Sequence, residues 1–95
     1  MTQSSRQLSG PQLRAARALA GISGEELAAR TNLSLKTIRR AESERGPVKL
    51  TRANTELLIS ALEALGVQFL DEDKNGGVGV RFAVNASRKR HPVAK

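Results

Sequence analysis

Three cationic side chains lie close together near the middle of the sequence. Lys36 and Arg40 are four residues apart, a spacing that places them on one face of a helix, and Arg39 precedes Arg40. Ammonium and guanidinium groups donate charged hydrogen bonds to phosphate oxygens, and arginine also suits the O6 and N7 acceptors of guanine. Most cations on a helix surface are merely solvated, so the meaning of these three depends on the elements that hold them.

The residues around these cations predict two short helices joined by a tight turn. A helix over residues 23–31 begins with Ser-Gly-Glu-Glu, a capping box in which the serine hydroxyl accepts an amide of the first turn and the glutamate reaches back. Asn32 tolerates the positive φ of a sharp turn. Ser34 then caps a second helix over residues 35–44.

Two such helices can meet only if small and apolar residues lie between them. Ala28 is the small residue at the expected contact. The residues that we expect to hold the second helix against the first are Leu27, Leu33, Ile38 and Ala41. The opposite face of the second helix then lies in solvent, and a helix presented in this way fits the major groove of B-DNA.

Residues 23–42, SGEELAARTNLSLKTIRRAE, resemble the helix-turn-helix of the phage repressor/Cro (Xre-type) family. The resemblance extends back through residues 12–17 and forward through residues 61–67, so it covers about residues 8–70. It implies an ion pair between Arg17 on the first helix and Glu42 near the end of the recognition helix. The residues expected to contact DNA are Gly24, Ser34, Leu35, Lys36, Thr37, Arg39 and Arg40.

The sequence also departs from this family. Gly24 replaces a glutamine that contacts a phosphate, so only a backbone amide remains there for that purpose. Asn32 replaces the glycine of the turn, and Thr31 stands at an apolar position. A fifth helix is often present in the family, whereas this chain has a strand pattern after the fourth, so dimer contacts do not carry over.

Two side chains and one basic segment keep more than one interpretation. Arg40 suits either a base or a phosphate, whereas Arg39 is expected to bind a phosphate. Leu35 either packs near Ile38 or meets a thymine methyl group at the exposed start of the recognition helix. The basic segment Arg88-Lys89-Arg90 is either solvated or adds phosphate contacts without sequence information.

The rest of the chain completes a mainly α fold. We expect a first helix over residues 10–20, with Pro11 in its first turn and Gly21 as its stop, and a fourth helix over residues 52–65. The inward stripe of this fourth helix is expected to be Leu58, Ala61, Leu62 and Leu65. After Gly66 the apolar period changes to two, which predicts a β-hairpin that packs on the fourth helix through Val67, Phe69, Val78, Val80 and Phe82.

The predicted organisation is therefore a four-helix, repressor-like helix-turn-helix domain followed by a C-terminal β-hairpin. The expected segments are a flexible N-terminus (1–9), the DNA-binding domain (10–66), the hairpin (67–84) and a basic disordered tail (85–95). A lone hairpin is marginal in water, and its open edge could pair with the same edge of a second copy. We therefore expect a homodimer with the hairpin at or near its interface.

Composition excludes several other classes. The chain has 95 residues, no cysteine, a single histidine (His91) and a net charge of +7, with the positive charge in residues 1–45 and 75–95. We therefore expect no metal site, no cofactor and no catalysis. Two phenylalanines and no tryptophan or tyrosine argue against single-strand binding by base stacking. No secretory signal or membrane span is evident, so we expect a cytoplasmic protein.

The expected function is sequence-specific binding of double-stranded DNA, with transcriptional repression by a homodimer. The alternative is an antitoxin or antiactivator module that uses the same fold to hold a partner protein. An enzyme has little support, because the sequence offers no nucleophile–base pair.

Overall fold

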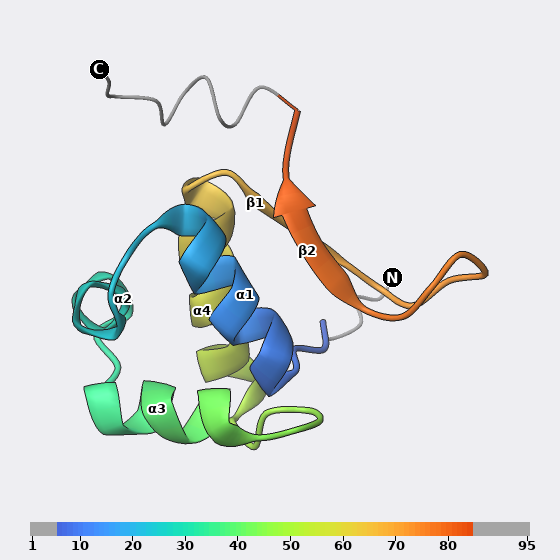
Figure 1. The fold of residues 1–95 in the computed structure, drawn as a ribbon. Helices are drawn as coiled ribbons and strands as arrows, with labels where there is room; N and C mark the ends of the chain where they lie inside the picture. Colours follow the sequence, from blue (N-terminus) through green and yellow to red (C-terminus); the bar gives the residue numbers. More distant parts are fainter. Residues whose placement is uncertain (1–5, 85–95) are drawn as a thin grey trace.

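The computed structural model describes residues 6–84, which form four helices followed by a two-stranded antiparallel hairpin (Figure 1). The elements in chain order are α1 (Gly10–Ala20), α2 (Gly24–Thr31), α3 (Leu35–Ser43), α4 (Arg52–Ala64), β1 (Val67–Leu70) and β2 (Gly79–Phe82). The predicted fold class is confirmed. Helices α3 and α4 each end one residue before the expected boundary, and α2 starts one residue after it.

Each helix begins at a hydroxyl side chain that accepts an amide of the first turn. These N-caps are Ser9, Ser23, Ser34 and Thr51. The complete capping box lies at Ser9, where Gln12 returns a hydrogen bond to the Ser9 amide. At Ser23 only the hydroxyl half forms, and the Glu26 carboxylate accepts from Arg30 instead. Local side-chain chemistry thus sets where all four helices start.

The expected turn residues adopt the left-handed backbone conformation. Gly21 ends α1 with φ 72°, and Asn32 ends α2 with φ 63°. Asn32 is the one non-glycine residue with positive φ in the part of the chain that the structure describes. Its short polar side chain tolerates this conformation better than most others, so α2 and α3 can be joined by a turn of three residues, 32–34.

The core draws residues from all four helices and from β1. Leu27, Ile38 and Ala41 are buried as expected, and Ala28 and Leu33 pack partly buried against them. On α4 the buried residues include Leu58 and Leu62 of the expected stripe, with Ala61 and Leu65 at its margin. The full set of buried apolar residues is Leu8, Leu13, Ala16, Ala20, Leu27, Ile38, Ala41, Leu58, Ile59, Leu62 and Val67.

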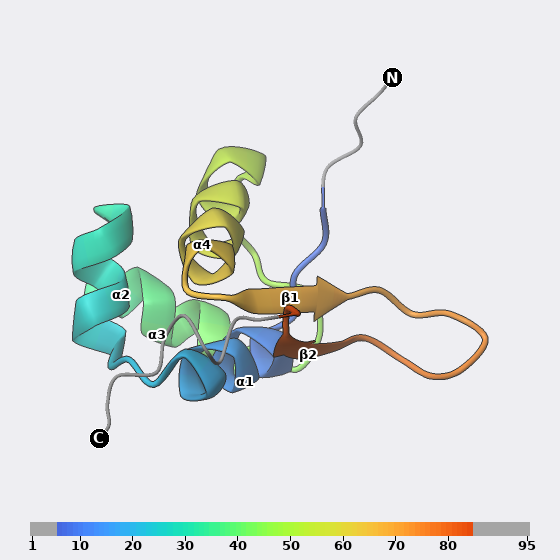
Figure 2. The ribbon, with the colours of Figure 1, turned by 90° about the horizontal axis from the view of Figure 1, so that it is seen from above.

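The hairpin packs on two helices rather than on α4 alone. β1 contacts α4 and α1, and β2 contacts α1 (Figure 2). Val67 pairs with Phe82, and Phe69 pairs with Val80, so these four residues share one face of the sheet. Val78 was expected on this face but is 53% exposed, because it precedes β2 and lies outside the paired segment.

The segment before α1 also differs from the expected flexible N-terminus. Leu8 is buried, and its carbonyl accepts the Val48 amide at 2.9 Å. The Arg6 guanidinium bridges Glu56 and Glu63 on α4, and its hydrogen bonds lower the pKa of Glu56. Residues 6–9 of the predicted flexible segment are therefore in contact with the folded domain. Residues 1–5 and the predicted basic tail, with His91, lie outside the described residues.

One close approach joins α1 to the last turn of α3. A β carbon on Gly10 would lie 2.0 Å from the Glu44 carbonyl oxygen and 2.9 Å from that of Ala41. Both neighbours are backbone atoms, which cannot rotate away as a side chain can. The Gly10 amide also donates to the Gly46 carbonyl at 3.0 Å. Only glycine fits at this joint.

We expect Gly10→Ala to lower the free energy of unfolding by at least about 3 kcal/mol, the upper end of the cost of overpacking, because the two helices must separate. Urea denaturation followed by circular dichroism measures the loss. Gly46→Ala is the matched control, since nothing lies within 4 Å of its β-carbon position. Equal stability of the two variants would contradict the close approach.

Candidate nucleic-acid interface

Helix α3 buries one side and presents the other. Ile38 and Ala41 are buried against the core, whereas Lys36, Arg39 and Arg40 are exposed. Of the other residues expected to contact DNA, Ser34 is exposed, and Gly24, Leu35 and Thr37 are partly buried. The structure therefore brings the predicted set together around α3 and the start of α2.

The expected ion pair between Arg17 and Glu42 is present. Arg17 Nε lies 2.7 Å from Glu42 Oε2 and Arg17 Nη2 lies 3.1 Å from Oε1, so the guanidinium binds the carboxylate with two hydrogen bonds. These bonds raise the pKa of Arg17. Arg17 also donates to the Ile22 carbonyl at 3.2 Å. One side chain of α1 thus links the loop before α2 to the end of α3.

A second arginine of α1 supports the same end of α3 and was not anticipated from the sequence. Arg14 Nη1 donates to the Glu42 backbone carbonyl. Carbonyl groups in the last turn of a helix lack partners within the helix. A cation at this place also interacts favourably with the negative end of the helix dipole. The signal was available, because Arg14 and Arg17 are three residues apart on α1 and therefore share a face.

The two hydroxyls at the start of α3 bind each other. Ser34 Oγ accepts the Thr37 amide at 3.0 Å and donates to Thr37 Oγ1 at 2.8 Å. The Ser34 hydroxyl is therefore occupied in closing the first turn. Thr37 keeps its own hydroxyl proton, which can be donated to an outside acceptor.

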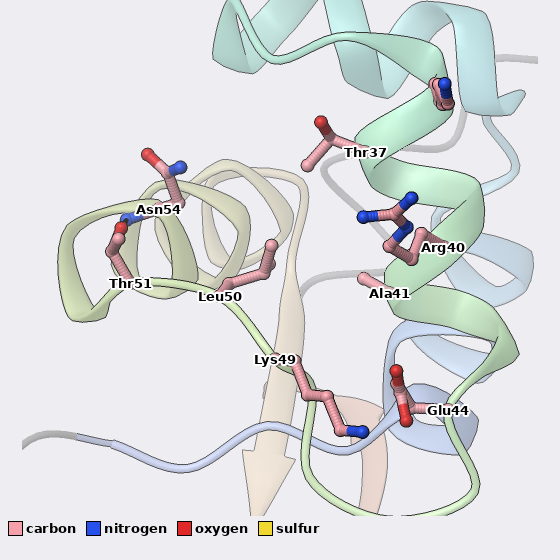
Figure 3. Close-up of a pocket in the computed structure, with 9 residues that line it drawn as sticks. Thr37, Arg40, Ala41, Glu44, Lys49, Leu50, Thr51 and Asn54 are labelled. Carbon is pink, nitrogen blue, oxygen red and sulfur yellow. Dashed lines mark hydrogen bonds between the residues drawn. The ribbon is translucent and has the colours of Figure 1, made fainter.

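A groove of about 370 Å³ separates α3 from the start of α4 (Figure 3). Thr37 and Arg40 point into it from α3, toward Leu50, Thr51 and Asn54. Lys36 and Lys49 add two further cations to its lining, and Glu44 adds one carboxylate. Among the described residues, no carboxylate lies within ion-pair distance of Lys36, Arg40 or Lys49.

The start of α4 gives this groove a second source of positive potential. Thr51 Oγ1 accepts the Asn54 amide at 3.1 Å, which leaves the amides of Arg52 and Ala53 as the first-turn donors that the helix does not use. Such amides, with the positive end of the helix dipole, suit an anion. Lys49, Thr51 and Asn54 were not among the predicted site residues, although Thr51 before the helix is a capping signal.

Arg39 lies on a different edge of the interface. Its Nη2 is 3.9 Å from Glu25 Oε2, and both side chains are more than two-thirds exposed. A pair this long and this exposed contributes little energy, so Arg39 remains able to bind another anion. The arrangement can therefore hold anions at two places, in the groove and beside α2, with the start of α3 between them.

Comparison with known proteins adds no assignment, since no protein-family model and no curated protein matches this chain. Within residues 6–84, no three residues among His, Asp and Glu gather where they could hold a metal ion. The longest helix within residues 6–84 has 13 residues. No helix in this part of the chain is long and apolar enough to cross a bilayer.

We expect Glu42→Gln to lower the free energy of unfolding by about 2 kcal/mol. This is less than the cost of breaking a fully buried pair, because Arg17 is 28% exposed. The substitution keeps the shape of the side chain but leaves the guanidinium without its counter-charge. Chemical denaturation measures the change.

The matched control is Glu26→Gln, which removes the exposed pair with Arg30 and is expected to cost about 0.5 kcal/mol or less. If the two variants were equally stable, Arg17–Glu42 would not be the fixing contact of α3.

Proposed function

We propose that this protein is a sequence-specific double-stranded DNA-binding transcriptional regulator. In this proposal it acts in the cytoplasm as a repressor, and α3 is its recognition helix. The observation that carries the proposal is the fixed presentation of α3. Its C-terminal end is tied to α1 by Arg14 and Arg17, while Lys36 and Arg40 remain exposed and have no carboxylate partner among residues 6–84.

The groove and the edges of α3 support a division of labour on a duplex. The start of α3 enters the major groove, where Lys36 and Arg40 meet acceptors on base edges. Arg39 on one side, and Lys49 with the first amides of α4 on the other, bind phosphates and fix the position of the protein. The backbone amide of Gly24, at the start of α2, is a further phosphate donor.

The proposal includes a homodimer. One helix-turn-helix reads few base pairs, and two copies bind half-sites about one helical turn apart. In the described part of the chain the sheet has two strands, so each strand forms one of its edges. Pairing of one hairpin edge with its counterpart in a second copy would extend the sheet across a two-fold axis. Repression then follows from occupation of a promoter by the dimer.

Selection from a random pool of duplexes tests the central proposal. We expect one sequence with two related half-sites to be enriched, and its affinity to fall steeply with salt, by about 0.9 in the logarithmic slope for each phosphate contact. Gel shifts across a salt series measure this slope. A pool with no enrichment would contradict the proposal and favour a module that binds a partner protein.

Alanine substitutions test the roles of the three cations. Lys36→Ala and Arg40→Ala should relax the preference for the selected sequence by about 5- to 150-fold, the value of a good base contact. Arg39→Ala should weaken binding to all duplexes alike. Arg30→Ala is the control, because Arg30 pairs with Glu26 on α2 and should alter neither property. Equal effects at residues 36, 39 and 40 would contradict the division of labour.

Light scattering tests the dimer. We expect the mass of two chains on the selected duplex. A single chain both in solution and on the duplex would contradict the dimer without contradicting DNA binding.

A further inference from the structure

At the start of α2, Gly24 lies directly against the side chain of Leu35, the first residue of α3. A β carbon built on Gly24 would lie 3.0 Å from Leu35 Cδ1, so the leucine side chain occupies the space in which a side chain at position 24 would begin. Gly24 does not have positive φ, so its backbone would accept any L-residue. The glycine therefore makes room for the leucine.

Leu35 is held in this position by the turn around it. Ser34 caps the helix through the Thr37 amide, and Ile38, one turn further along, is completely buried. Leu35 itself is only partly buried. One side of its isobutyl group thus packs on Gly24, and the remainder is exposed at the N-terminal end of α3. In the proposed complex this end enters the major groove of DNA.

The polar groups beside Leu35 do not compete for the same contact. The Ser34 hydroxyl is engaged with Thr37, and Lys36 is exposed on the next position of the helix. An isobutyl group neither donates nor accepts hydrogen bonds. If it faced a bare donor or acceptor on a base edge, that group would lose water without compensation. The partner that suits it must be apolar.

The major-groove edges of the four bases offer one apolar group, the C5 methyl of thymine. Cytosine carries a methyl at the same position when it is methylated at C5. We infer that Leu35, seated on Gly24, contacts the C5 methyl group of a pyrimidine and makes the proposed DNA complex selective for it. This role rests on the proposed function and names the feature of the operator that the first residue of α3 recognises.

Gly24 is a positioning residue in this arrangement. A methyl group at position 24 would displace Leu35 Cδ1 by a few tenths of an ångström, because 3.0 Å is shorter than an ordinary carbon–carbon contact. The end of a leucine side chain can make such a shift without unfolding the protein. Gly24→Ala should therefore change recognition of the methyl group while the protein stays folded.

Base analogues in the selected duplex test this inference. Each thymine of a half-site is replaced in turn by deoxyuridine, which removes only the methyl group, and each cytosine is replaced in turn by 5-methyldeoxycytidine. Fluorescence anisotropy measures the dissociation constants. For the wild-type protein we expect deoxyuridine at one position to weaken binding about fourfold, the value of one buried methyl, and more when both half-sites carry it.

Protein variants test whether Leu35 and Gly24 are the residues that recognise the methyl group. Leu35→Ala should bind the thymine and uracil duplexes equally, whereas Leu35→Met, which keeps apolar reach, should retain the preference. Gly24→Ala should reduce it. Lys36→Ala is the control, because it should weaken binding yet keep the same thymine-to-uracil ratio. Thermal unfolding by circular dichroism establishes that each variant is folded, and Leu35→Met and Gly24→Ala carry the test if Leu35→Ala is not.

The possible results distinguish thymine from methylated cytosine as the source of the methyl group. They also distinguish failure of this inference from failure of the proposed function. Loss of affinity at one uracil assigns the methyl to thymine, and a gain at one methylated cytosine assigns it to that base. Specific binding that responds to neither replacement, or a ratio that Leu35→Ala leaves unchanged, would overturn the inference and leave the proposed function intact. A pool from which no duplex is enriched would overturn both.

Discussion

The attachment of α1 to the C-terminal end of α3 is the constraint on which the interface depends. Gly10 meets the Glu44 carbonyl so closely that no β carbon fits, Arg17 binds the Glu42 carboxylate through two hydrogen bonds, and Arg14 donates to a carbonyl of the same turn. Because α3 is held at this end and by Ile38 in its middle, its other end is fixed in space while Ser34 and Lys36 stay exposed. The proposed recognition role needs both properties, since a helix that could tilt would not place its side chains reproducibly.

The positive charges of the protein differ in whether they are paired with carboxylates. The net charge of +7 suggests a general attraction for polyanions, but the arginines do not contribute equally. Arg6 is paired with carboxylates of α4, Arg17 with one on α3, and Arg30 with one on its own helix. Lys36, Arg40 and Lys49 stand around a single groove. Their position beside the first turn of α4 concentrates the field where a phosphate would lie.

Local signals made most of the fold predictable. Hydroxyl caps and left-handed stops, Gly21 and Asn32 among them, act within a few residues of the chain, so the helix boundaries were predicted to within about one residue. Contacts between distant segments were not predictable in this way. Leu8 is a single apolar residue in a polar stretch and has no periodicity to mark it as core. The fit of Gly10 against Glu44 depends on the angle between two helices. For Leu35 the sequence left two roles open, and the structure shows that packing on Gly24 and partial exposure occur together.

Gln12 joins the first helix to the hairpin through buried hydrogen bonds. Its side-chain oxygen accepts the Ser9 amide at the start of α1, and its nitrogen donates to the carbonyls of Leu70 and Gly79, one on each strand. One buried amide therefore caps a helix and fastens both arms of the hairpin. If the chain ended at Gly66, this amide would lose two acceptors and the buried faces of α1 and α4 would be opened to water. The hairpin therefore shares one core with the four helices, with Val67 buried among their apolar residues, and does not form a separate unit beside them.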